Sequence, residues 1–195
     1  MTRKIGLLLL LTFHFFPLSA QPEEAGEIIS FYPQYLFFHG IKAGWENHLK
    51  KNQWLIVSPE IYYDENTDQW DNSYKTVYGG GITLHHKSYL DEQVNNTPYF
   101  ALQTGYNYFS IEGYRYGDNE INPGIHQISG GFTLGIQPRL FSKIFLDLYL
   151  GAELTKSFAI NNQNAEMESF KQNMWDYAYT GPVFLIGLKI CLIKN

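Results

Sequence analysis

The chain has 195 residues, of which 45% are hydrophobic and 17% charged, and its mean hydropathy is −0.25. These values give room for one folded domain and exclude both a multi-helix membrane protein and a disordered chain. The net charge of −5 makes nucleic acid an unexpected partner, and the 15 Tyr, 14 Phe and 4 Trp favour strands and interfaces.

Residues 1–20 have the pattern of a cleavable secretory signal peptide. Arg3 and Lys4 precede an apolar run over 5–16, and small residues follow before Gln21. The apolar run is shorter than the roughly 20 residues that a membrane-spanning helix needs. We therefore expect a signal peptide over 1–20 and one exported domain over 21–195. That domain has no intrachain disulfide, because Cys191 is the only cysteine of the chain.

Apolar residues recur at every second position after residue 20, the spacing that places alternate side chains on opposite faces of a strand. Over 144–157, for example, Leu146, Leu148 and Leu150 alternate with polar or small residues that include Asp147 and Glu153. The pattern predicts eight strands, at 26–36, 40–49, 53–63, 74–88, 98–111, 125–139, 144–157 and 178–192.

The connections between these strands alternate in length. Short connections are expected near 50–52, 91–97 and 141–143, and long ones at 64–73, 112–124 and 158–177. The first connection, near 37–40, is expected to be a tight hairpin. Short turns on one side and long loops on the other, joined by alternating strands, are typical of outer-membrane β-barrels. Aromatic residues near strand ends, including Trp45, Trp54, Tyr99 and Phe158, fit membrane-interface belts.

Alternation alone does not say which face points inward, so we compared the two faces. The polar face carries four basic and four acidic side chains and is rich in glycine, which suits a narrow interior better than a solvated surface. We therefore predict an all-β, eight-stranded antiparallel up-and-down transmembrane barrel, with its interior filled by a structural charge network. The predicted members are Lys42, Glu46, Glu60, Lys87, Arg139, Asp147, Glu153 and Lys189.

Three stretches carry a resemblance to a known group: the leader, residues 41–46 (IKAGWE), and residues 130–135 (GGFTLG) leading into 146–151 (LDLYLG). Together they resemble small outer-membrane barrels of Bacteroidota and, more distantly, OmpX-type and OmpA-type barrels. The resemblance implies a fold and a location, but no activity.

The sequence points to no catalytic, metal or cofactor site. His126 and Ser129 are expected on opposite faces of one strand, as are His85 and His86. The leading hypothesis is a non-enzymatic outer-membrane barrel that is not a general porin and serves the envelope structurally or through surface interaction. Its partners would be outer-membrane lipid and a ligand or protein bound by loops 64–73, 112–124 and 158–177. The alternatives are a lipid-modifying outer-membrane enzyme and a soluble periplasmic lipocalin-like barrel with an apolar ligand.

Overall fold

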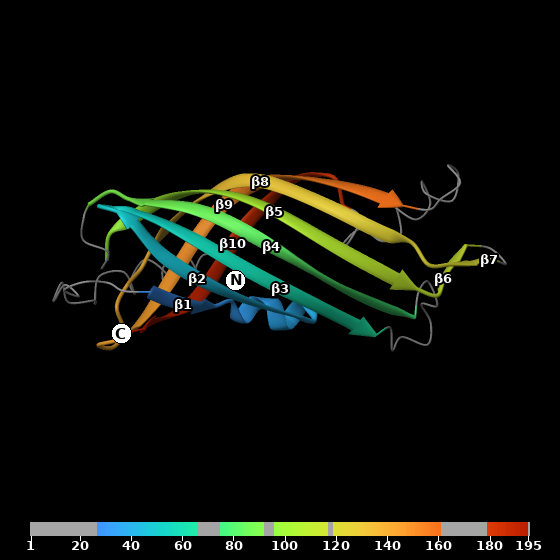
Figure 1. The fold of residues 1–195 in the computed structure, drawn as a ribbon, viewed down its shortest axis with the longest axis horizontal. Coiled ribbons are helices and arrows are strands. Elements are labelled where there is room, and N and C mark those ends of the chain that lie inside the picture. Colours follow the sequence, from blue (N-terminus) through green and yellow to red (C-terminus); the bar gives the residue numbers. More distant parts are fainter. Residues whose placement is uncertain (1–26, 66–74, 92–95, 117–118, 161–178, 195) are drawn as a thin grey trace, which may run out of the picture.

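The computed structural model describes residues 27–65, 75–91, 96–116, 119–160 and 179–194, and they form a closed antiparallel barrel (Figure 1). Sequential strands pair with one another, and the last strand pairs with the first. This confirms the predicted all-β, eight-stranded up-and-down topology. The expected signal peptide, 1–20, lies outside the described residues. The barrel strands are β1 (Glu27–Phe31), β2 (Gly40–Lys50), β3 (Gln53–Glu65), β4 (Thr76–Tyr89), β5 (Pro98–Glu112), β8 (Gly124–Ile136), β9 (Ile144–Ile160) and β10 (Gly181–Lys194).

The first strand is much shorter than expected. β1 ends at Phe31, and a 3-10 helix, η1 (Pro33–Phe38), follows it (Figure 1). Pro33 has no amide hydrogen to donate to a neighbouring strand and suits the first turn of a helix, so the strand stops here. The predicted tight hairpin near 37–40 is therefore wrong. Within the described ranges, no helix has the length and apolar character needed to cross a membrane.

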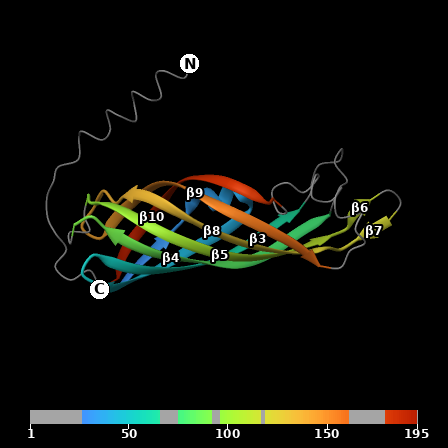
Figure 2. The same ribbon diagram turned by 90° about the horizontal axis from the view of Figure 1, so that it is seen from above.

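The barrel has two unlike ends. The short connections, Glu27 and Lys194 lie at one end, which we call the turn end. At the other, the loop end, a hairpin of β6 (Tyr114–Tyr116) and β7 (Asn119–Ile121) projects beyond the barrel (Figure 2). This hairpin forms most of the predicted long loop 112–124. The loops predicted at 64–73 and 158–177 lie largely outside the described residues.

Side chains alternate between the two faces of the wall in the predicted sense. Phe184 and Ile186 point outward and are 88% and 87% exposed, whereas Lys87 and Asp147 point inward and are fully buried. Outward residues of neighbouring strands form continuous apolar rows: Leu150 of β9 pairs with Leu134 of β8 and with Ile186 of β10. The charged side chains therefore lie inside the barrel, together with a buried apolar cluster that includes Ile28, Trp54 and Phe145, and large apolar side chains cover the outer surface.

Glycines on the inner face leave room for long side chains from neighbouring strands. A Cβ atom on Gly81 would overlap the side-chain oxygen of Asn107, and one on Gly187 would overlap the hydroxyl of Tyr149. These close approaches explain why glycine alternates with polar residues in the inward pattern.

Candidate functional site

An ionic cluster of Glu46, Lys87, Asp147 and Lys189 lies buried inside the barrel toward the turn end. The Lys87 Nζ atom lies 2.8 Å from Asp147 Oδ2 and 3.2 Å from Glu46 Oε2. The Lys189 Nζ atom lies 3.4 Å from the same Asp147 oxygen. Because β2, β4, β9 and β10 each supply one member, the cluster links strands across the lumen. Two ammonium groups balance two carboxylates, as burial of charge requires.

Neutral side chains complete the hydrogen bonds of this cluster. The Tyr99 hydroxyl donates to Asp147 Oδ1 at 2.5 Å, and the Gln137 amide donates to Asp147 Oδ2 at 3.0 Å. The Tyr89 hydroxyl in turn donates to the Gln137 side-chain oxygen. The ammonium of Lys87 also lies 4.2 Å from the centre of the Tyr99 ring, a favourable cation–π distance. The Asp147 carboxylate therefore has ion-pair or hydrogen-bond partners on both of its oxygens, and neutral side chains pack around the cluster.

Two of the aromatic residues assigned to membrane-interface belts lie inside the barrel instead. Trp54 and Tyr99 are 1% and 2% exposed, whereas Trp45 and Phe158 do lie on the outer surface. The belt assignment was wrong for Trp54 and Tyr99 because it considered only how close a residue lies to the strand end. It ignored whether the residue falls on an inward or an outward position of the alternating pattern. Tyr99 pairs with Tyr89 of β4, which lies two residues from Lys87 and therefore points inward as Lys87 does. This register places the Tyr99 hydroxyl in the ionic cluster.

A second ion pair lies further along the axis. The Lys42 Nζ atom is 2.7 Å from Glu60 Oε2, and both side chains are almost completely buried. Lys42 also donates hydrogen bonds to Thr83 at 2.8 Å and to the Tyr35 hydroxyl at 3.1 Å. This pair joins β2 and β3 to β4 and η1.

The remaining two residues of the predicted network lie apart from these groups. Glu153 accepts a hydrogen bond from the Gln103 amide at 2.8 Å, and no Lys or Arg of the described residues lies within ion-pair distance of it. Arg139 follows the end of β8, where alternation stops, and its guanidinium donates to the carbonyls of Phe141 and Ser142 in the next turn. The structure therefore brings six of the eight predicted residues into two groups.

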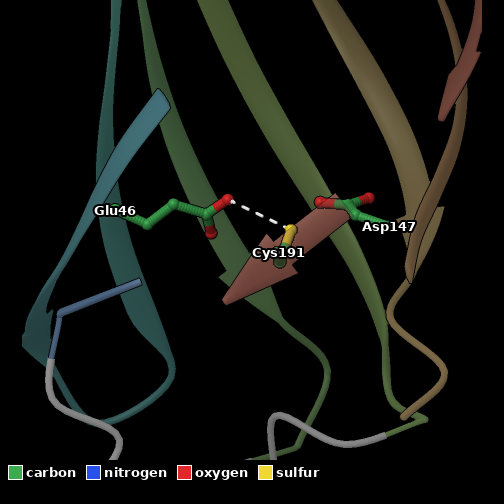
Figure 3. A group of neighbouring side chains, drawn as sticks. All are labelled: Glu46, Asp147 and Cys191. Atoms are coloured by element: carbon green, nitrogen blue, oxygen red, sulfur yellow. Dashed lines mark hydrogen bonds between the residues drawn. The ribbon is translucent and has the colours of Figure 1, made fainter. Parts of the chain in front are cut away.

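Cys191 lies beside the ionic cluster and adds a third ligand-type atom to its two carboxylates (Figure 3). The ligand atoms of Glu46, Asp147 and Cys191 lie within 4.8 Å of one another, and the thiol is 3.9 Å from Glu46 Oε1. A metal ion at this point would face the Lys87 ammonium, which already neutralises the same carboxylates. We interpret the group as part of the ionic cluster.

The loop end of the interior holds a cavity of about 640 Å³, the loop-end cavity. Inward residues of β5, β8 and β9 line it, together with η1 and part of β10. The side-chain oxygens of Gln34 and Asn107 are buried without a hydrogen-bond partner among the described residues. The sequence did not predict this cavity, because nothing in the period-two pattern shows that β1 ends early.

Comparison with protein-family models, curated proteins and solved structures finds no match. The observed fold agrees with a small barrel, while the resemblance to barrels of Bacteroidota stays a prediction.

The two residue pairs considered as catalytic or metal sites, His126 with Ser129 and His85 with His86, lie on opposite faces of their strands, as expected. His126 lies against the outward rings of Tyr106 and Tyr108 and contacts the Tyr106 hydroxyl at 2.6 Å, whereas Ser129 lies on the inward face beside Gly105. A serine nucleophile needs its base within hydrogen-bond reach, so this pair does not form one. His85 is buried and His86 is exposed, on opposite faces of β4.

Proposed function

We propose that the chain is a non-enzymatic outer-membrane β-barrel protein with a structural or surface-interaction role in the cell envelope. The observation that carries the proposal is the reversed distribution of side chains. Ion pairs with almost no exposed surface lie on the axis, and large apolar side chains cover the outside. Water would make this distribution costly, whereas lipid makes it favourable.

The same distribution argues against a soluble lipocalin-like barrel with an apolar ligand. Such a barrel keeps its apolar face inside and its polar face in water. Here the lumen contains Lys42, Glu60 and the ionic cluster, while Leu150, Leu154 and Phe184 are 60%, 69% and 88% exposed. An apolar ligand would meet charges inside and leave these outer side chains in solvent.

A general diffusion pore is also disfavoured. An eight-stranded barrel encloses only enough space for its own side chains. In this chain the ionic cluster occupies that space at the turn end, and Tyr89, Tyr99 and Gln137 pack around it. The role is therefore expected to lie at the outer surface or at the loop end.

The β6–β7 hairpin is the feature that best supports surface interaction. It extends past the barrel rim (Figure 2). At its base, the Gly113 amide donates a hydrogen bond to the Asn122 side-chain oxygen at 2.8 Å. Gly113 has a φ of +68°, which allows the chain to turn between β5 and β6 without strain. A protein or glycan outside the cell could contact this hairpin.

Membrane fractionation tests the proposed location. The exported chain should remain in the outer-membrane pellet after washing with carbonate and with urea, and should enter solution only with detergent. Release by carbonate alone would instead indicate a soluble or peripheral barrel. Mass spectrometry of lipid A from cells with and without the protein should show no difference, and a changed lipid A mass would favour the lipid-modifying enzyme.

A further inference from the structure

The barrel wall is interrupted on one side of the loop end. β10 pairs with β9 from Gly181 to Leu192, but its other edge pairs with β1 only from Ile190 onward. On the opposite side of this interruption, β2 is paired with β1 only as far as Ala43. The helix η1 occupies the space between these two edges, where the Gln34 amide donates to the Tyr149 hydroxyl at 2.9 Å.

The loop-end cavity reaches the outer surface through this interruption. Its lining includes inward residues such as Asn107 and Glu153, and also Phe184 and Ile186, which point outward. Phe37 and Phe38 of η1 complete the apolar part, and both are largely exposed. One cavity therefore has a polar inner part and an apolar part that opens sideways.

The polar part holds buried acceptors that have no partner among the described residues. The side-chain oxygens of Gln34 and Asn107 are buried without a hydrogen-bond partner in the described part of the chain. Among the described residues, the Glu153 carboxylate has one hydrogen-bond partner, the Gln103 amide. Among the described residues that line the cavity there is no Lys or Arg. A ligand with hydrogen-bond donors and a positive charge would satisfy these unpaired acceptors and the Glu153 carboxylate.

The rings around this polar part match the same ligand. Tyr62 and Phe109 pack against each other at 5.3 Å between ring centres, and Tyr149, whose ring centre lies 5.3 Å from the Lys189 ammonium, also belongs to the cavity lining. Aromatic faces attract ammonium groups, most strongly where water is excluded. The apolar part between η1 and β10 suits a hydrocarbon chain.

We propose that the loop-end cavity binds a free alkylamine, with the ammonium group at Glu153 and the alkyl chain between η1 and β10. A phospholipid with an ammonium headgroup fits less well, because its phosphate would meet no Lys or Arg of the described lining. The assignment of the ammonium group to Glu153 depends only on the geometry of the lumen. Sideways entry of the chain rests on the proposed membrane location.

Calorimetric titration of the purified full-length chain in a nonionic detergent tests the proposal. Octylammonium should bind saturably, and octanol, octanoate and lysophosphatidylethanolamine should each bind at least about tenfold more weakly. Affinity should rise with each methylene from propyl to octyl, by up to about fourfold per methylene. Equal affinity for octanol or octanoate would overturn the ammonium assignment, and tighter binding of the phospholipid would overturn the free amine.

Two matched variants locate the site. Glu153→Gln keeps an oxygen that can accept from Gln103, so the fold should persist, and octylammonium affinity should fall by about tenfold or more. Glu65→Gln, which removes an exposed carboxylate outside the cavity lining, should bind like the unmodified protein. Equal affinity of Glu153→Gln and the unmodified chain would refute the site. Because binding is measured in detergent, its failure is distinguishable from a failure of the membrane location.

Discussion

At the residue scale, the interior charges differ in how completely they are paired. Asp147 contacts two lysines, a tyrosine and a glutamine, and Lys42 contacts Glu60 and two hydroxyls. Within the part of the chain that the structure describes, Glu153 contacts one partner, the Gln103 amide. In a buried site, removal of one partner leaves the other charge uncompensated, and this penalty exceeds the net worth of the pair. The three carboxylates should therefore respond differently to neutralisation.

Replacement of Lys87 by Met should be strongly destabilising. It leaves the Glu46 and Asp147 carboxylates with Lys189 as their only ammonium in the cluster, so we expect a loss of about 3–5 kcal/mol in the free energy of unfolding. Urea titration of the protein in lipid vesicles measures this loss. Addition of Glu46→Gln restores charge balance, so the double variant should lose less than the sum of the two single variants. Additive losses would contradict the coupling.

Glu60→Gln and Glu153→Gln form a matched pair with different expected outcomes. Glu60 is paired with buried Lys42, so its neutralisation strands an ammonium and should lower stability markedly. Glu153→Gln strands no cation of the described residues and should change the free energy of unfolding by less than about 1 kcal/mol. The sequence led us to expect an interior cation at Glu153. Equal losses in the two variants would restore that expectation.

At the scale of the strand, the period-two alternation predicted most strand positions and which side chains point inward. Seven of the eight strands lie within a few residues of their predicted positions, and the inward charges at Lys87 and Asp147 follow from the period of two. The alternation does not show where a strand ends. The early end of β1 depends on Pro33, and the position of Arg139 depends on where β8 stops. The loop-end cavity follows from the first of these, so it too lay beyond a pattern-based prediction.

An arginine on the outer face of β9 should report whether that face meets lipid. Leu150 is 60% exposed and lies in the apolar row with Leu134 and Ile186. Leu150→Arg should therefore cost about 2–4 kcal/mol in vesicles if the row lies near the bilayer midplane. Leu90→Arg is the control, since Leu90 is 77% exposed at the turn end beyond β4. Equal small effects of both substitutions would argue for solvent around the row.

At the scale of the whole molecule, the two ends of the lumen differ in what they contain. The turn end is filled by paired charges and rings, whereas the loop end keeps a cavity and a projecting hairpin. The proposed surface role needs a ligand site at one end and no passage for solutes through the other. This division agrees with a surface role better than with transport.

Liposomes that contain the purified protein should swell in arabinose no faster than protein-free liposomes. The ionic cluster blocks the lumen at the turn end, and eight strands leave no free channel around it. Liposomes with a known porin provide the positive control. Rapid swelling would show that the cluster does not close the barrel in a bilayer.

The short first strand also affects how the ring can assemble. β1 contributes five residue pairs with β10 and four with β2, whereas β4 and β5 share fourteen. The hairpins from β2 to β10 join neighbours in the chain and can form early, because little loop entropy opposes them. Joining Glu27 to Lys194 brings together residues 167 apart for very few backbone hydrogen bonds. Ring closure is therefore expected to be the last step of folding and the first to reverse.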